Sequence, residues 1–213
     1  MENWPLFFII GIPLAITIGL VFNFLFALVD ELHIAAFHRP IYIHLYTNFL
    51  EISVEQEKIL TEKFEFYNKL STKRKKYFNH RVTLFLEKYE FIPRDNIVIN
   101  EEVQTIIAAT YVMLTFGMRH FLLTAFDKII IYPEEYYSTF SEQYHKGEYN
   151  PRMKAVVFSW KHFYEGFETS NDNLNLGLHE FAHVVHFEGL RKTDTSSTIF
   201  AAAYDDIMEQ IKR

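Results

Sequence analysis

The pattern of hydrophobic and polar residues divides this chain into a long apolar segment and a mixed remainder. From residue 5 to residue 29 no side chain is charged, and a stretch of this length can cross a bilayer as a helix. Farther along, apolar residues recur at helical spacing over residues 53–70, 72–89 and 101–116. The pattern therefore predicts one transmembrane helix followed by a layer of three helices.

Polar residues mark where the three later helices begin. Ser53 and Gln56 have the spacing of a capping box. Ser71 or Thr72 can cap the second helix, and Asn100 can cap the third. We therefore expect each helix to start at one of these positions.

Two short runs of β-branched and aromatic residues follow the helices. The first is Ile129-Ile-Ile-Tyr132, and the second reads Ala-Val-Val-Phe-Ser-Trp over residues 155–160. Both are expected to form strands, so the predicted fold class is α+β. The second strand is expected either to offer an edge to an extended peptide or to be an ordinary core strand.

Composition and charge narrow the classes of function. The net charge of -6 argues against a nucleic-acid partner, and the one basic cluster, at residues 73–76, is expected to be solvated. The chain has no cysteine, which excludes disulfides and thiolate metal ligands. A metal bound by this chain must therefore rest on histidine and carboxylate groups.

The candidate chemistry lies in one short motif near the carboxyl-terminal end. His179, Glu180 and His183 spell His-Glu-x-x-His, without Gly or Pro from residue 178 to residue 188. Two histidines four residues apart on a helix share a face, so both imidazoles can reach one metal ion. The carboxylate of Glu180 lies at the edge of that face, where it can act as a general base. The motif predicts a Zn2+ site with two histidine ligands and Glu180 as the catalytic residue.

His186 is three residues beyond the motif, on nearly the same face. It could be a third ligand, a group that supports the ligands, or a residue at the rim; we favour the supporting role. The alternative for the whole motif is that its histidines are ordinary ones satisfied by their neighbours.

Several separate blocks in this order resemble the zinc peptidases related to Mlc titration factor A, the glucose-regulated metallopeptidases. Besides the motif, the blocks are Ile106-Ile-Ala-Ala109, Lys128-Ile-Ile-Ile-Tyr-Pro133, Gly147-Glu148, Ala155-Val-Val-Phe-Ser-Trp160 and Asn175. The resemblance covers about residues 55–187. It implies a zincin-like fold, zinc-dependent peptidase activity of aminopeptidase type, and a metal held by two histidines and a downstream glutamate.

The third ligand is where the chain departs from the family. In relatives it belongs to a Glu-Phe-Phe-Ala-like block well beyond the motif helix, and no such block precedes Arg213. We favour the explanation that the sequence is truncated at its carboxyl terminus. Otherwise Asp205, Asp206 or Glu209, on an expected helix after residue 197, would serve as the ligand.

The sequence thus predicts a transmembrane anchor at residues 1–31 and a zincin-like peptidase domain at residues 32–213. Arg39 places that domain in the cytoplasm by the positive-inside tendency. We expect a membrane-anchored zinc metallopeptidase acting on peptides or proteins. The alternatives are a catalytically weak module that sequesters a regulatory protein such as a transcriptional repressor, which the family suggests, and a structural metal clip that would not need Glu180.

Overall fold

A computed structural model describes residues 4–138, 142–168, 175–191 and 195–212 of the chain. The chain divides into two compact units, residues 1–43 and residues 44–213. The first unit consists of one long helix and the turn that follows it. The second contains every strand among the described residues and the predicted metal-binding motif.

Helix α1, Trp4–Phe37, forms most of the first unit. Its apolar side chains are exposed along its length, and it is long and apolar enough to cross a membrane. Signal sequences near an amino terminus share these properties. The helix itself was predicted, and it extends eight residues beyond the uncharged stretch.

The chain turns back on itself after α1. The buried carboxylate of Asp30 accepts a hydrogen bond from the backbone N–H of Ile41, and Nδ1 of His33 lies 2.8 Å from the carbonyl oxygen of Arg39. His38, at the turn, has a left-handed backbone with φ of 52°. These contacts fix the segment that leaves the helix.

Four helices open the second unit, at the predicted places. They are α2, Val54–Lys63; α3, Glu65–Asn68; α4, Thr72–Lys88; and α5, Glu101–Thr115. Ser53 and Gln56 form the predicted capping box, while Ser71 and Asn100 accept hydrogen bonds from the first turns of α4 and α5. The first predicted helix is interrupted at Phe64, which takes an extended backbone and buries its ring against Phe167.

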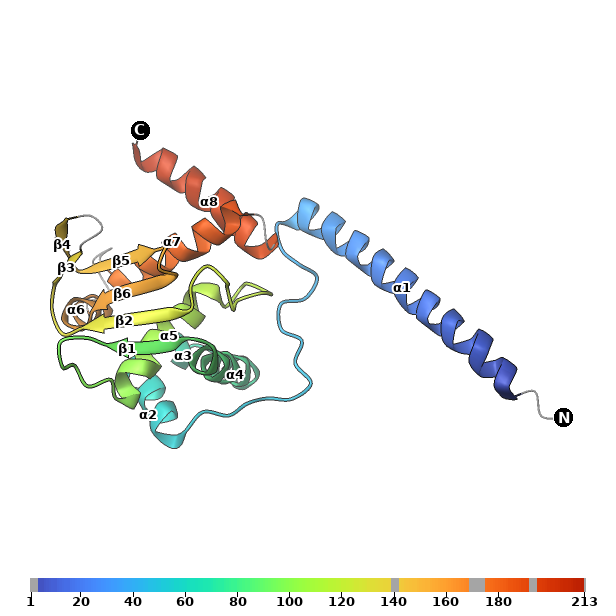
Figure 1. The fold of residues 1–213 in the computed structure, drawn as a ribbon, viewed down its shortest axis with the longest axis horizontal. Helices are drawn as coiled ribbons and strands as arrows, with labels where there is room; N and C mark the ends of the chain where they lie inside the picture. The colour runs from blue at the N-terminus through green and yellow to red at the C-terminus, as the bar shows by residue number, and fades with distance from the viewer. Residues whose placement is uncertain (1–3, 139–141, 169–174, 192–194, 213) are drawn as a thin grey trace. The chain divides into compact units, whose positions relative to one another are not determined.

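The main sheet has four strands in the order β1-β2-β6-β5, as Figure 1 shows. Their bounds are Glu90–Pro93 for β1, Lys128–Tyr132 for β2, Ala155–Ser159 for β6 and Gly147–Asn150 for β5. The pairs β1–β2 and β2–β6 are parallel, and β5 pairs antiparallel with β6. A separate hairpin joins β3, Tyr136–Ser138, to β4, Gln143–His145.

The expectation that the strand at residues 155–160 could be an edge is wrong. Strand β6 lies between β2 and β5, and all five of its residues are buried, as an ordinary core strand requires. Trp160 was expected in this strand, but it begins helix α6, Trp160–Glu168. The open edges of the sheet are β1 and β5.

The two faces of the sheet pack differently. One face contributes Ile129, Ile131, Val156 and Phe158 to the main core, which also holds buried residues of α2, α4, α5, α6 and α7. The other face carries a smaller cluster with Ile130, Val157 and Tyr136 of the hairpin. Helices on one face of a small sheet make the α+β class correct.

Two helices end the chain, α7, Leu176–Leu190, and α8, Thr195–Lys212. They pack against each other and lie side by side in Figure 1. Helix α7 carries the predicted motif, and α8 is the helix expected after residue 197.

Candidate metal centre

Helix α7 is capped at its amino terminus by Asn175, whose side-chain oxygen accepts a hydrogen bond of 2.9 Å from the backbone N–H of Leu178. Phe181, Val184 and Val185 are fully buried and anchor one face of the helix in the core. The opposite face remains accessible. This asymmetry sets which residues of the motif can meet a ligand.

Three glycines let neighbouring elements approach α7 closely. A Cβ atom at Gly147 would lie 2.8 Å from a side-chain atom of Leu176, and one at Gly177 would lie 2.5 Å from the ring of Phe163. A Cβ atom at Gly189 would lie 2.2 Å from the carbonyl oxygen of Ser197 in α8. Strand β5 and helices α6 and α8 therefore hold α7 from three sides.

His179 and His183 bring their Nε2 atoms to 3.0 Å, with the two rings nearly perpendicular. Nitrogens bound at about 2.05 Å to a tetrahedral zinc ion would lie about 3.3 Å apart. The pair therefore fits two ligands of one cation, and the same separation also permits a hydrogen bond between the rings. Burial lowers the pKa of His183, with His179 and His186 adding to the effect, which favours the neutral imidazole that a metal requires.

The side chain of Glu180 reaches strand β5. Its side chain is 6% exposed, and Oε2 accepts a hydrogen bond of 3.0 Å from the backbone N–H of Tyr149. Burial raises the pKa of Glu180 to about 7; the hydrogen bond from Tyr149 opposes the shift and nearby Glu148 adds to it. A carboxylate in this environment is suited to exchanging a proton.

Within the described part of the chain, no third acidic or histidine side chain joins the pair in a metal-binding group. Of the three carboxylates predicted as alternatives, Asp205 lies 2.9 Å from Nε2 of His186. The side chains of Asp206 and Glu209 fall outside the described residues. His186 thus contacts α8, and its ring lies 4.8 Å from that of Tyr204.

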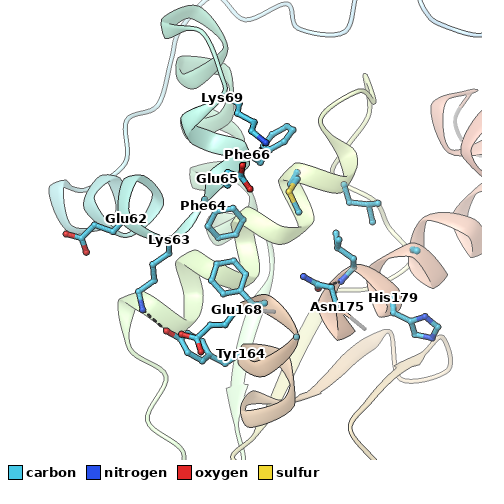
Figure 2. Close-up of a pocket in the computed structure, with 16 residues that line it drawn as sticks. Glu62, Lys63, Phe64, Glu65, Phe66, Lys69, Tyr164, Glu168, Asn175 and His179 are labelled. Carbon is cyan, nitrogen blue, oxygen red and sulfur yellow. Dashed lines mark hydrogen bonds and ion pairs between the residues drawn. The ribbon is translucent and has the colours of Figure 1, made fainter. Parts of the chain in front are cut away.

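Two cavities adjoin the motif. The smaller one, about 420 Å³, lies between β5 and α7 and is lined by Glu148, Glu180, His183 and apolar groups of Tyr149 and Phe187. The larger one, about 1100 Å³, extends from His179 to α2, α3, α5 and α6. Figure 2 shows His179 at one end of the larger cavity and Lys63 and Tyr164 at the other.

Sequence reasoning missed the part of this site that β5 supplies. The block Gly147-Glu148 was noticed for its resemblance, and no role was assigned to it. Tyr149 contributes a backbone N–H, which any residue except proline would provide. Such a contribution has no side-chain signature and becomes visible only in the fold.

Comparison with known proteins places the chain in a family. The family model described as glucose-regulated metallo-peptidase M90 matches residues 46–196. An uncharacterized protein of Synechocystis sp. is 24% identical over 180 residues, which cover 73% of this chain. The match spans 65% of that relative's length.

Proposed function

Because the chain belongs to the glucose-regulated metallo-peptidase M90 family, we propose that it hydrolyses peptide bonds with a zinc ion held by His179 and His183. The observation that carries the proposal is the pair of Nε2 atoms at 3.0 Å beside the buried carboxylate of Glu180. When bound, zinc would supply an activated water molecule and a polarised carbonyl group. The third ligand would be a carboxylate whose identity stays open, and the side chains of two local candidates, Asp206 and Glu209, are outside the described residues.

Glu180 is the general base in this proposal. One carboxylate oxygen, Oε2, is fixed by the N–H of Tyr149, so the other can take a proton and return it to the leaving amine. Burial keeps the side chain from turning into solvent. The metal-binding pair and the proton acceptor thus stand on one helix, oriented by one strand.

Strand β5 is suited to present the substrate. Because the carbonyl of Lys146 accepts from the N–H of Ser159 in β6, the alternation of an antiparallel ladder turns the backbone groups of Gly147 and Tyr149 away from β6. The N–H of Tyr149 donates to Glu180, so the groups left for a substrate are the N–H and carbonyl of Gly147 and the carbonyl of Tyr149. An extended peptide can add to such an edge through backbone hydrogen bonds. It would then pass directly beside Glu180.

Glu148 supports aminopeptidase-type cleavage. It lines the smaller cavity with Glu180, and no lysine or arginine is among the described residues that line this cavity. A free α-amino group, which is positively charged, would be favoured there. In this proposal Glu148→Gln lowers kcat/KM for peptides with a free amino terminus more than for the same peptides acetylated. An equal effect on both would contradict the aminopeptidase assignment.

Substitution of Glu180 tests the peptidase proposal. We expect zinc-loaded Glu180→Gln to lose about a hundredfold or more of the rate of peptide cleavage while still binding zinc. Glu55→Gln, an exposed glutamate in the first turn of α2, is the control and should keep full activity. Cleavage by zinc-loaded Glu180→Gln at the parent rate would refute the assignment of the base.

The family match favours the hydrolase over the other prediction from the sequence, a non-catalytic module. Metal content and activity separate the two. Stoichiometric zinc, with activity removed by a chelator and restored by zinc, supports the enzyme. Retained binding of a regulatory protein by a chain that holds no zinc supports the module.

We also propose that α1 anchors the protein in a membrane. The support is its exposed apolar surface and its hydropathy. Chain expressed with α1 intact should sediment with membranes, resist alkaline extraction and keep its full mass. A chain shortened by the length of α1 and recovered in the soluble fraction would identify a cleaved signal sequence instead. Protease protection of residues 44–213 would test the cytoplasmic assignment.

A further inference from the structure

The larger cavity beside His179 has an apolar lining, and we call it the Phe64 cavity. Its apolar wall consists of Phe64, Phe66, Met113, Leu114, Phe167 and Leu178. Phe64 and Phe167 pack with ring centroids 4.8 Å apart. The wall is therefore built from two faces of the domain, α2–α3 with α5 on one side and α6–α7 on the other.

The two lysines that line the Phe64 cavity already have partners. The amino group of Lys63 donates to Glu102 and to the hydroxyl of Tyr164, and Lys69 is paired with Glu65. Figure 2 shows the contact between Lys63 and Tyr164 at the edge of the cavity. The lysines are thereby neutralised, and the other charged groups that line the cavity, Glu62 and Glu168, are acidic, which disfavours an acidic ligand. A group that enters gains chiefly by burying apolar surface.

The position of the Phe64 cavity on α7 relates it to the proposed reaction. Asn175, Leu178, His179 and Ala182 border it, whereas Glu180, His183, His186, Phe187 and Leu190 border the smaller cavity. At about 100° per residue, these two sets face directions roughly 90° apart on the helix, with the histidine pair between them. A peptide that crosses the pair therefore meets one cavity on each side.

We propose that the Phe64 cavity binds a bulky apolar side chain, aromatic or long aliphatic, on the opposite side of the scissile bond from the residue near Glu148. The inference rests on the proposed peptidase function and names its substrate class. The volume of the Phe64 cavity is more than twice that of the smaller cavity, so the larger side chain is accepted in the Phe64 cavity. Small side chains leave the apolar wall uncovered and acidic side chains meet Glu62 and Glu168, so both kinds bind less well.

Cleavage of a peptide series tests the preference. In Ala-X-Ala peptides, Phe or Leu at X should give kcat/KM about tenfold or more above Ala, and Asp should be the poorest. Leu114→Trp narrows the cavity and should reduce the ratio of the Phe to the Ala peptide severalfold. Val98→Trp, at an exposed position, is the matched control and should keep the ratio. Equal kcat/KM for Phe and Ala, or an unchanged ratio in Leu114→Trp, would overturn the inference.

A binding measurement separates this inference from the peptidase proposal. Met113 borders the cavity, whereas Met153 is exposed elsewhere, so carbon-13 methyl resonances of these two residues report occupancy locally. In the full chain carrying Glu180→Gln, the Phe peptide should shift the Met113 resonance, and the Ala peptide should shift it less. A parent chain that cleaves no peptide would refute the proposed function alone, since this shift needs no bond to break. A Met113 resonance that does not respond to the Phe peptide would refute the subsite.

Discussion

The backbone N–H of Tyr149 donates a hydrogen bond of 3.0 Å to Oε2 of Glu180. This contact joins the proposed general base on α7 to the open edge of the sheet. Gly147, two residues earlier on β5, makes room for it, because a Cβ atom there would lie 3.0 Å from Cγ of Glu180. The strand that can receive a peptide thus also positions the base.

Gly147→Ala should therefore displace Glu180. We expect kcat for peptide cleavage to fall about tenfold or more, with little change in zinc affinity, because the nearest neighbours of the new methyl group are Leu176 and Glu180 and not the histidine pair. Steady-state kinetics and zinc titration on the purified chain measure the two effects.

Two further variants show whether Glu180 causes that loss. The added methyl group also approaches Leu176 at 2.8 Å, so Gly147→Ala combined with Leu176→Ala removes one of the two close contacts. Recovery of kcat in the double variant would mean that Leu176, and not Glu180, transmits the effect. Gly117→Ala, where nothing lies within 4 Å of the new atom, should behave as the parent.

Gly189 should govern the packing of α8 on α7. A Cβ atom there would lie 2.2 Å from the backbone oxygen of Ser197 and 2.6 Å from Cβ of Ala201. Since backbone cannot move aside as easily as a side chain, Gly189→Ala should reduce the free energy of unfolding by about 1–3 kcal/mol. Urea denaturation checks this, and a stability equal to that of Gly117→Ala would show that the helices are farther apart.

Arg81 should be a main support of the helical layer. It is fully buried, and its guanidinium group donates to the carbonyls of Thr115 and Met118 and, from Nε, to the hydroxyl of Tyr46. Arg81→Met leaves buried carbonyls without a donor and should cost on the order of 3 kcal/mol. Tyr46→Phe removes one hydrogen bond and should cost about 1 kcal/mol. Equal stability of the parent, Arg81→Met and Tyr46→Phe in urea would contradict this role of Arg81.

Two histidines beside Arg81 should make the domain less stable in acid. The N–H of Leu50 donates to Nδ1 of His80, which must be unprotonated to accept it. Burial lowers the pKa of His80, Arg81 lowers it further, and Glu87 opposes them. Burial also lowers the pKa of His44 to about 4, with Arg81 and Arg74 adding to the effect.

These lowered pKa values set the direction in which the stability of the fold changes with pH. As pH falls through about 6.5, the unfolded chain takes up protons that the folded chain refuses. Stability should therefore decrease from pH 6.5 toward pH 4 and gain nothing from these groups above pH 7. His80→Asn keeps an acceptor for the N–H of Leu50 but does not titrate. The variant should therefore lose less stability than the parent between pH 7.5 and pH 5.5. Parallel pH profiles would exclude His80 as a cause.

Local signals in the sequence predicted what depends on local structure. The caps at Ser53, Ser71 and Asn100 and the motif helix follow from side-chain chemistry within a few residues, and each is present. The uncharged stretch also predicted α1. The identity of the family followed from several blocks together.

Features that depend on distant pairing were missed. Strand β1, Glu90–Pro93, was not predicted, and this short run becomes a strand because β2 pairs with it. The sequence left open whether β6 is an edge or a core strand, and the edge position belongs to β5, since neighbours in a sheet are set by topology and not by composition. The interruption at Phe64 has the same origin, in a ring drawn into the core.

The metal content of the purified chain tests the central claim most directly. X-ray absorption at the zinc edge should show about one zinc ion per chain with two imidazole nitrogens about 2.0–2.1 Å from the metal. His179→Ala and His183→Ala should each remove one imidazole or abolish binding, whereas His120→Ala, at an exposed position outside the site, should not. A chain without zinc, or zinc with an imidazole shell that both motif variants leave unchanged, would contradict the account.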